Sequence, residues 1–287
     1  MKPARAFYAR EALAVAPELI GLHLVHEQGG LRRVGRIVET EAYMGPEDRA
    51  AHSSGGRRTA RTEVMFGPPG HAYVYLIYGF WNCLNVVTGP RGVPHAVLLR
   101  AVEPVAIIEH GTTGTKVAPF GPGSKAPQAT FDNRTRGTKV APFAPGSKEP
   151  EATFDYRTWG PGLLCRAMHV DRGLNGADLR AGTLWIERPA GFRAARLGVS
   201  ARIGVEYAQS WARRPWRFFD RDSPWVSTVT ASARRRAVTD PSLLHPKARV
   251  RCEELRTPSS EEQDGQGRSG GRGRGGRRAG RGPRSGA

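Results

Sequence analysis

The stretch that decides the fold of this chain is R-I-V-E-T-E-A-Y, residues 36–43. Polar and apolar residues alternate along it, which is the pattern of a β-strand with two different faces. One face carries Ile37, Glu39, Glu41 and Tyr43. The other face carries Val38 and is the expected core face. Two glutamates and a tyrosine together predict either a solvated face or a pocket in which one carboxylate acts as a base.

A second stretch, H-A-Y-V-Y-L-I-Y-G-F-W-N-C-L-N-V-V at residues 71–87, predicts a β-hairpin. Tyr73 and Tyr75 share a face of its first strand, and residues 80–82 form the expected tip before a return strand at 83–88. We therefore expect Tyr75 to face a pocket and Tyr78 to project near the hairpin end. An aromatic-rich sandwich core is the alternative explanation for these tyrosines.

Further short elements surround these two stretches. We expect a helical segment at residues 6–20, with a fresh turn beginning at Pro17, and strands at 22–26, 96–102 and 182–187. Short strands joined by Gly/Pro turns, with few helices, predict an α+β fold. The expected architecture is a single domain with a largely antiparallel sheet and a protruding β-hairpin.

A tandem repeat interrupts this pattern. Residues 114–136 and 137–159 are two copies of a 23-residue unit, identical at 18 positions. Two copies are too few for a solenoid, and their Pro/Gly-rich composition buries little surface. We therefore predict one domain built from residues 1–113 and 160–235, a disordered repeat insertion at 114–159, and a polar, RG-rich disordered tail at 236–287.

The net charge of +18 on 287 residues favours a polyanionic partner. The segment 265–287 holds seven arginines and no acid, so the remaining chain still carries +11. In the block 201–227, Trp211, Trp216 and Trp225 alternate with Arg213, Arg214 and Arg217, which suggests core residues beside a phosphate-facing rim.

Cysteine and histidine spacing argues against metal sites and disulfides. Cys83, Cys165 and Cys252 are unclustered, and the pair His23 and His26 lacks a third ligand nearby. No apolar run has membrane-spanning length and no signal peptide opens the chain. We expect a protein without a metal or other cofactor, in the cytoplasm at the nucleoid.

Ordered motifs across the chain resemble the alkyladenine (3-methylpurine) DNA glycosylase family. They are F-Y-A-R-E (7–11), L-I-G-L-H-L-V (19–25), R-I-V-E-T-E-A-Y (36–43), G-P-E-D (45–48), A-A-H-S (50–53), Y-V-Y (73–75), I-Y-G (77–79), L-L-R-A (98–101), A-R-I-G-V (201–205), W-A-R-R-P-W-R-F-F (211–219) and S-P-W-V-S (223–227). The resemblance covers residues 7–109 and 160–228. One departure is Leu163, where the family commonly carries lysine.

The resemblance implies an enzyme that flips alkylated purines of the 3-methyladenine type out of duplex DNA and hydrolyses the N-glycosidic bond, leaving an abasic site. Glu41 would activate the attacking water, and Arg100 would help to hold that water. The base pocket would consist of Tyr43, His52 and Tyr75, with Asn85 sensing the purine edge. Tyr78 would intercalate into the gap from the minor groove. The expected partner is double-stranded DNA with damaged purines. We expect the protein to act as a monomer and not to associate with a membrane.

Simpler roles remain open for several of these residues. His52 could hydrogen-bond a loop only, and Asn85 could only tie down a turn. Arg100 could be a buried partner of Glu39 or Glu103, and we expect Glu39 itself to be structural. A non-catalytic module for damaged DNA and an RNA-binding protein are the alternative functions, the latter suggested only by the RG-rich tail.

The positions of the lysines indicate which nucleophile is available. A glycosylase that also cleaves the strand attacks with an amine, usually that of a lysine. The six lysines are Lys2, Lys116, Lys125, Lys139, Lys148 and Lys247. None lies between residues 36 and 100, so the sequence predicts a monofunctional enzyme that uses water. The alternative is an attack by Lys2 or the N-terminal amine.

Overall fold

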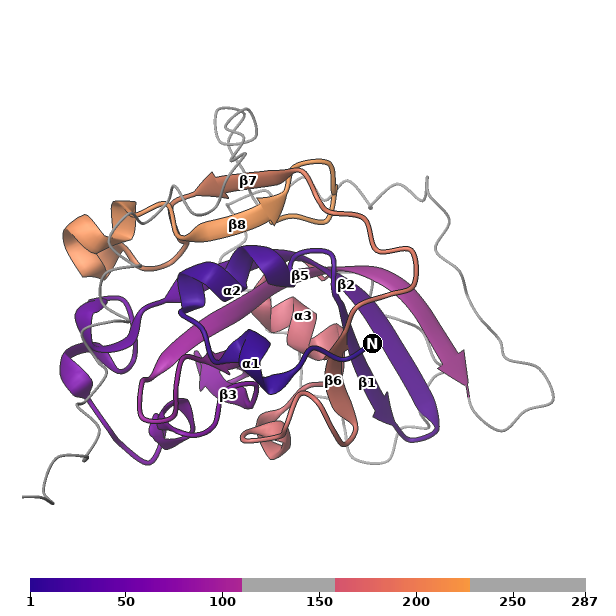
Figure 1. The fold of residues 1–287 in the computed structure, drawn as a ribbon, viewed down its shortest axis with the longest axis horizontal. Coiled ribbons are helices and arrows are strands. Elements are labelled where there is room, and N and C mark those ends of the chain that lie inside the picture. Colours follow the sequence, from indigo (N-terminus) through magenta and orange to yellow (C-terminus); the bar gives the residue numbers. More distant parts are fainter. Residues whose placement is uncertain (110–157, 228–287) are drawn as a thin grey trace, which may run out of the picture. The chain divides into compact units, whose positions relative to one another are not determined.

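The computed structural model describes residues 1–109 and 158–227, which form a mixed α/β fold dominated by one curled antiparallel sheet (Figure 1). The strands are β1 His23–Gln28, β2 Leu31–Tyr43, β3 Ala72–Ile77, β4 Trp81–Thr88, β5 His95–Glu109, β6 Leu184–Glu187, β7 Leu197–Ser200 and β8 Arg217–Asp220. Six of them follow the order β3-β4-β5-β2-β1-β6, while β8 pairs with β2 and β7. The prediction of a largely antiparallel sheet is confirmed for the described residues.

Three short α-helices accompany the sheet: α1 Arg5–Tyr8, α2 Ala12–Leu19 and α3 Pro161–Ala167. Short 3-10 helices η1 to η5 span Gly45–Glu47, Ser54–Gly56, Glu63–Phe66, Arg172–Leu174 and Glu206–Arg213. Figure 1 shows α2 lying across the sheet, where it buries Val15, Ala16 and Leu19 in the main core. The predicted turn at Pro17 was wrong, because this residue lies inside α2. Burial of its ring favours this position and offsets the backbone hydrogen bond that proline cannot donate.

Strand β2 is the centre of the sheet because it has neighbours along both edges. Residues 31–36 pair with β1 and residues 39–41 pair with β8, while β5 runs along the opposite edge. The pairing with β5 skips Val38 on β2, and it skips Arg100 and Val105 on β5. Such bulges change the direction in which neighbouring side chains point.

The bulges correct the predicted faces of β2. Ile37 and Ala42 belong to the main core, whereas Val38 packs in a separate cluster with Phe219 and Trp225. Glu39 and Glu41 are both fully buried, so the strand has no solvated face at this point. The expected alternation fails at Val38 because one extra residue there shifts the side-chain period.

The hairpin β3–β4 has its tip two residues earlier than predicted. Ile77 pairs with Trp81, so residues 78–80 connect the strands. Tyr78 and Gly79 have φ angles of 51° and 79°, which make the turn at this point. Tyr78 is 83% exposed and Phe80 is 67% exposed, so the tip presents two aromatic side chains to solvent.

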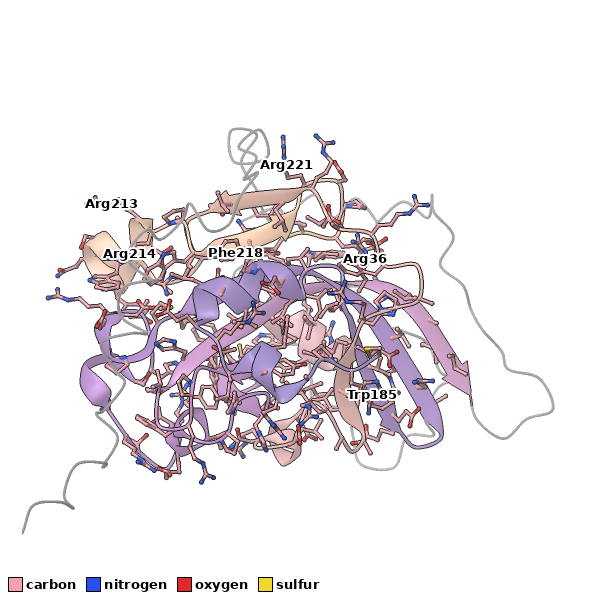
Figure 2. The ribbon with its side chains drawn as sticks, viewed as in Figure 1. Arg36, Trp185, Arg213, Arg214, Phe218 and Arg221 are labelled. Atoms are coloured by element: carbon pink, nitrogen blue, oxygen red, sulfur yellow. The ribbon has the colours of Figure 1, made fainter. Side chains whose placement is uncertain are left out.

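The block around β8 combines core and surface residues. Figure 2 shows Phe218 directed into the fold over α2, whereas Arg213 projects outward at the end of η5. Trp216 and Trp225 are buried, and Arg214 stacks 3.6 Å above the ring centroid of Trp211. The suggested place of Arg217 on an exposed rim was wrong, because its side chain is buried beside Glu39.

Most of the predicted insertion and the whole predicted tail lie outside the described residues, so the domain boundaries stay predictions. Thr158 and Trp159, the last two residues of the second repeat, are described. Thr158 donates a hydrogen bond to the carbonyl of Val102, and the ring of Trp159 lies 5.9 Å from that of Trp225. In the two described ranges, every helix is too short or too polar to cross a membrane.

Candidate active site

A pocket of about 480 Å³ lies between the hairpin β3–β4, the end of β2 and the loop that follows β7. This volume is in the range of small-molecule sites. Six of the seven predicted site residues line it: Tyr43, His52, Tyr75, Tyr78, Asn85 and Arg100. The seventh, Glu41, is fully buried behind this lining and contacts three of the lining residues.

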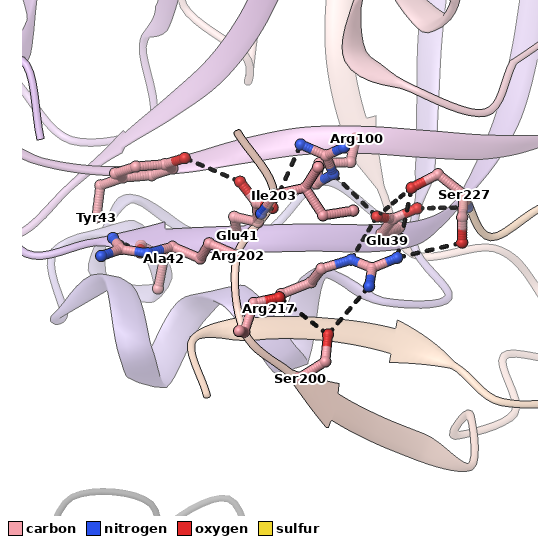
Figure 3. Close-up of polar contacts among 11 residues, drawn as sticks. Glu39, Glu41, Ala42, Tyr43, Arg100, Ser200, Arg202, Ile203, Arg217 and Ser227 are labelled. Carbon is pink, nitrogen blue, oxygen red and sulfur yellow. Dashed lines mark hydrogen bonds and ion pairs between the residues drawn. The ribbon is translucent and has the colours of Figure 1, made fainter. Parts of the chain in front are cut away.

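Both carboxylate oxygens of Glu41 are held (Figure 3). The backbone N–H of Ile203 donates to Oε1 over 2.8 Å, and the hydroxyl of Tyr43 donates to Oε2 over 2.8 Å. Nη1 of Arg100 lies 3.3 Å from Oε1. Each carboxylate oxygen offers two lone pairs, so Oε2 keeps one that no described protein group occupies. Oε2 of Glu41 can therefore accept one further hydrogen bond.

Arg100 contacts both glutamates of the motif. Its Nε donates to Oε1 of Glu39 over 2.9 Å, in addition to the Nη1 contact with Glu41. Burial opposes its positive charge, but Glu41 and Glu39 outweigh this and raise the pKa of Arg100. Of the two partners considered from the sequence, Glu39 is the observed one, since Glu103 pairs with Arg36 instead.

Aromatic rings form one wall of the pocket. The ring of His52 meets that of Tyr75 edge-on, with centroids 4.5 Å apart, and Tyr73 lies 5.3 Å from Tyr75. Nδ1 of His52 is hydrogen-bonded to the hydroxyl of Tyr73 over 2.9 Å. Burial, with a contribution from Arg61, lowers the pKa of His52 to about 4, so the imidazole is neutral at pH 7. His52 thus hydrogen-bonds Tyr73 in strand β3, rather than a loop, and lies in the pocket wall.

Asn85 and Tyr78 both line this pocket, but Asn85 is buried and Tyr78 is exposed. Asn85 is 3% exposed, and its Nδ2 donates to the carbonyl of Tyr73 over 3.1 Å. This bond fixes the amide, so its Oδ1 has a defined direction. Tyr78, at the hairpin tip, contributes to the rim of the pocket while most of its side chain meets solvent.

Several residues at the site were missed by sequence reasoning. Arg61 lines the pocket with its guanidinium 4.9 Å from the ring centroid of Tyr75. Arg202 stacks 4.7 Å from the ring centroid of Tyr43 and forms a fully buried ion pair with Asp48, with Nη2 to Oδ1 at 2.9 Å. Asp48 belongs to the G-P-E-D motif and Arg202 to the A-R-I-G-V motif, but the sequence does not indicate that the two side chains form a pair. The described residues include no cluster of three or more His, Cys, Asp or Glu that could hold a metal ion.

The buried histidines predict an acid-sensitive fold. Burial lowers the pKa values of His52 and His95 from 6.5 to about 4 in each case. The unfolded chain therefore binds more protons than the folded one between pH 6.5 and 4, and the free energy of unfolding falls as the pH drops through this window. We expect a contribution of up to roughly 1.4 kcal/mol per pH unit from each histidine.

Urea unfolding at pH 7, 6 and 5 checks this expectation. His95→Gln should unfold with a shallower pH dependence than the wild-type chain because one of the two histidines whose pKa is lowered to about 4 is gone. His23→Gln is the comparison variant, since His23 lies in β1 away from the pocket and its pKa is lowered less. Equal slopes for wild type and His95→Gln would contradict the expectation.

Most of the sequence resembles known proteins of one family. The sequence pattern of the family described as Methylpurine-DNA glycosylase (MPG) matches residues 6–224. A relative from Anaeromyxobacter dehalogenans is 44% identical over 229 residues, covering 79% of this chain and 86% of the relative. A relative from Bacillus cytotoxicus is 40% identical over 231 residues, covering 79% of this chain and 100% of the relative. Both carry the words 3-methyladenine DNA glycosylase in their names.

Proposed function

This chain belongs to the methylpurine-DNA glycosylase family, and we propose that it performs the family's reaction at the pocket in front of Glu41. It is a 3-methyladenine DNA glycosylase of base-excision repair, a hydrolase of N-glycosyl bonds whose substrate is damaged DNA. The observation that carries the proposed site is a fully buried carboxylate behind a pocket lined with aromatic side chains.

Glu41 is the proposed general base. A water molecule in the pocket would donate to the free lone pair of Oε2 and attack the glycosidic carbon as Glu41 takes its proton. The Tyr43 hydroxyl and the Ile203 amide hold the carboxylate in place, and neither of them occupies this lone pair. Arg100, whose Nη1 lies 3.3 Å from Oε1 of Glu41, would stabilise the negative charge of Glu41 and help to orient the same water. No cofactor takes part in this proposal.

The extruded base would lie among Tyr43, His52 and Tyr75. Stacking on aromatic rings contributes about 1–3 kcal/mol per base without requiring one hydrogen-bond pattern. A cationic alkylated purine gains cation–π attraction in addition. Asn85, whose amide is held by the Tyr73 carbonyl, would contact the purine edge.

A duplex must lose a stacked base before the pocket can receive it. Tyr78 is proposed to fill the gap from the minor groove, because its ring stands exposed at the hairpin tip. The proposed partner is therefore double-stranded DNA with damaged purines. That the enzyme is a monomer and acts in the cytoplasm at the nucleoid stays a prediction. The family membership favours this function over a non-catalytic DNA-binding module or an RNA-binding protein.

The test of the proposed function is release of a free purine from methylated duplex DNA. The wild-type protein should release 3-methyladenine and leave alkali-labile abasic sites in an otherwise intact strand. His52→Ala should lower the rate, because the base loses part of its stacking surface. Wild-type protein that binds the methylated duplex without releasing purine would instead support the non-catalytic alternative.

The proposed role of Tyr78 gives a binding prediction. Tyr78→Ala should weaken the affinity for a duplex with an abasic site about tenfold, since roughly one stacking interaction of 1–3 kcal/mol is lost. Tyr78→Trp keeps an aromatic ring and should bind within about threefold of wild type. Fluorescence anisotropy with labelled duplex measures both. Unchanged affinity of the alanine variant would show that Tyr78 does not intercalate.

A further inference from the structure

Glu39, the first glutamate of the E-T-E motif, makes more contacts than a structural ion pair requires. Its Oε1 accepts hydrogen bonds from Nε of Arg100 at 2.9 Å, from Nε of Arg217 at 2.7 Å and from the Ser227 hydroxyl at 2.7 Å. Its Oε2 accepts from the backbone N–H of Ser227 at 2.7 Å. Figure 3 shows these groups converging on one carboxylate beside Glu41.

Arg100 stands between two carboxylates at unequal distances. Its Nε lies 2.9 Å from Glu39, whereas its Nη1 lies 3.3 Å from Glu41. Guanidinium groups form their strongest pairs when two N–H bonds meet one carboxylate. Arg100 does not make such a pair with Glu41, because its Nε edge is held by Glu39. The bulge at Arg100 directs the side chain toward this position.

We propose that Glu39 is a positioning residue for excision, which holds Arg100 back from Glu41 so that Glu41 can still accept a proton from water. The inference rests on the proposed role of Glu41 as the base. Without the charge of Glu39, Arg100 is free to turn both N–H bonds onto Glu41. A bidentate Arg100 would occupy the lone pairs that the attacking water needs and would stabilise the carboxylate against protonation.

The surroundings of Glu39 keep it charged and fixed. Burial works against its ionised form, but Arg100 and Arg217 outweigh this and lower the pKa of Glu39. Residues 223–227 cover it, with Trp225 and Val226 packed against Val38 and Phe219. Two arginines and two glutamates thus form a buried network without net charge, in which each position depends on the others.

Single-turnover excision and binding measurements test this proposal. Glu39→Gln keeps the shape of the side chain and removes its charge. We expect excision to slow at least tenfold, while the affinity for an abasic duplex stays within about threefold of wild type, since Glu39 does not line the pocket. An excision rate equal to that of wild type would overturn the proposal.

A double-mutant cycle separates positioning from general stability. If Glu39 acts through Arg100, Glu39→Gln should have less than about threefold further effect once Arg100→Gln is present. If Glu39 only supports the fold, the two losses should multiply, which would overturn the proposal. Asp220→Asn is the matched control, because Asp220 is also buried and paired with an arginine, Arg36, but contacts neither glutamate. It should lower stability without slowing excision.

If Glu39→Gln does not fold, Glu39→Asp tests whether Glu39 positions Arg100. Aspartate keeps the charge but withdraws the carboxylate by about one carbon–carbon bond, which lengthens the contact with Arg100. The expected result is a rate loss of about threefold or more with affinity retained, and a wild-type rate would overturn the proposal. Failure of the proposed function would look different, because the wild-type protein would then release no purine. Failure of the proposed role of Glu41 would also look different, because Glu41→Gln would then still release purine.

Discussion

Replacing Glu41 by Gln should slow purine excision by about three orders of magnitude, while the affinity for a lesion-bearing duplex stays nearly unchanged. Glutamine keeps the shape of the side chain and can still accept the hydrogen bond from the Ile203 N–H, but it cannot take a proton from water. Loss of a general base typically costs about a hundredfold to ten-thousandfold in rate. Single-turnover kinetics with excess enzyme measure the chemical step directly.

The matched control for this variant is Glu63→Gln. Glu63 is an exposed glutamate whose only described ion pair is with the exposed Arg58. Surface pairs of this kind contribute little, so excision should stay at the wild-type rate. If Glu41→Gln released purine at a rate close to that of wild type, Glu41 would not be the base.

Replacing Asp48 by Ala should lower the free energy of unfolding by about 3–5 kcal/mol, the loss expected when one partner of a buried ion pair is removed. The side chains of Asp48 and Arg202 are both fully buried. Among the described residues, the remaining Arg202 charge would keep the carbonyls of Ala42 and Trp211 as its hydrogen-bond acceptors. Excision should also slow, because Arg202 packs on Tyr43 and precedes Ile203, whose N–H holds Glu41.

Asp222→Ala provides the comparison for this loss. Asp222 pairs with Arg196, and the two side chains are 55% and 68% exposed. Its removal should change the free energy of unfolding by less than about 1 kcal/mol. Urea denaturation of both variants checks the contrast. Equal destabilisation by the two substitutions would show that burial of the Asp48 pair is not the source of its stabilisation.

The strands and the hairpin could be predicted because their signals are local. Alternation in residues 36–43 and 71–87 is a property of neighbouring residues. It correctly predicted that β2, β3 and β4 are strands. The hairpin tip was misplaced by two residues because the turn depends on positive φ angles at Tyr78 and Gly79, which composition alone does not reveal for a tyrosine.

The bulges at Val38 and Arg100 could not be predicted. The skipped residues Val38 and Arg100 lie on different strands, and their effect appears only once β2 and β5 are paired. These bulges place Arg100 between Glu39 and Glu41 and give β2 two buried faces. A pattern of alternation on either strand alone contains no information about this register.

The site residues that sequence reasoning missed act through the backbone or through distant partners. Ile203 holds Glu41 with its N–H, a group that every residue except proline carries. Arg202 and Asp48 are separated by 154 positions, and neither residue alone differs from a surface charge. Tyr73 was placed on the correct face. Its bond to His52 depends on the fold of the preceding loop, and its carbonyl accepts from Asn85 across the hairpin.

The positions of the amines in the described residues indicate whether an amine could act as the nucleophile. Lys2 is the only lysine in residues 1–109 and 158–227, and its Nζ lies 4.3 Å from the ring centroid of Trp185 in β6. The N-terminal amine donates to the carbonyl of Arg188. Neither group lines the pocket, so no amine of the described residues is placed to attack a base held there.

The central claim is that a water activated by Glu41 attacks the glycosidic carbon, and borohydride trapping during turnover tests it most directly. A duplex with a 3-methyladenine-type lesion is incubated with the enzyme and sodium borohydride, and the products are separated by denaturing electrophoresis. The account predicts free purine, an abasic strand without a break, and no covalent protein–DNA adduct. A covalent adduct would require an amine nucleophile and would contradict the account.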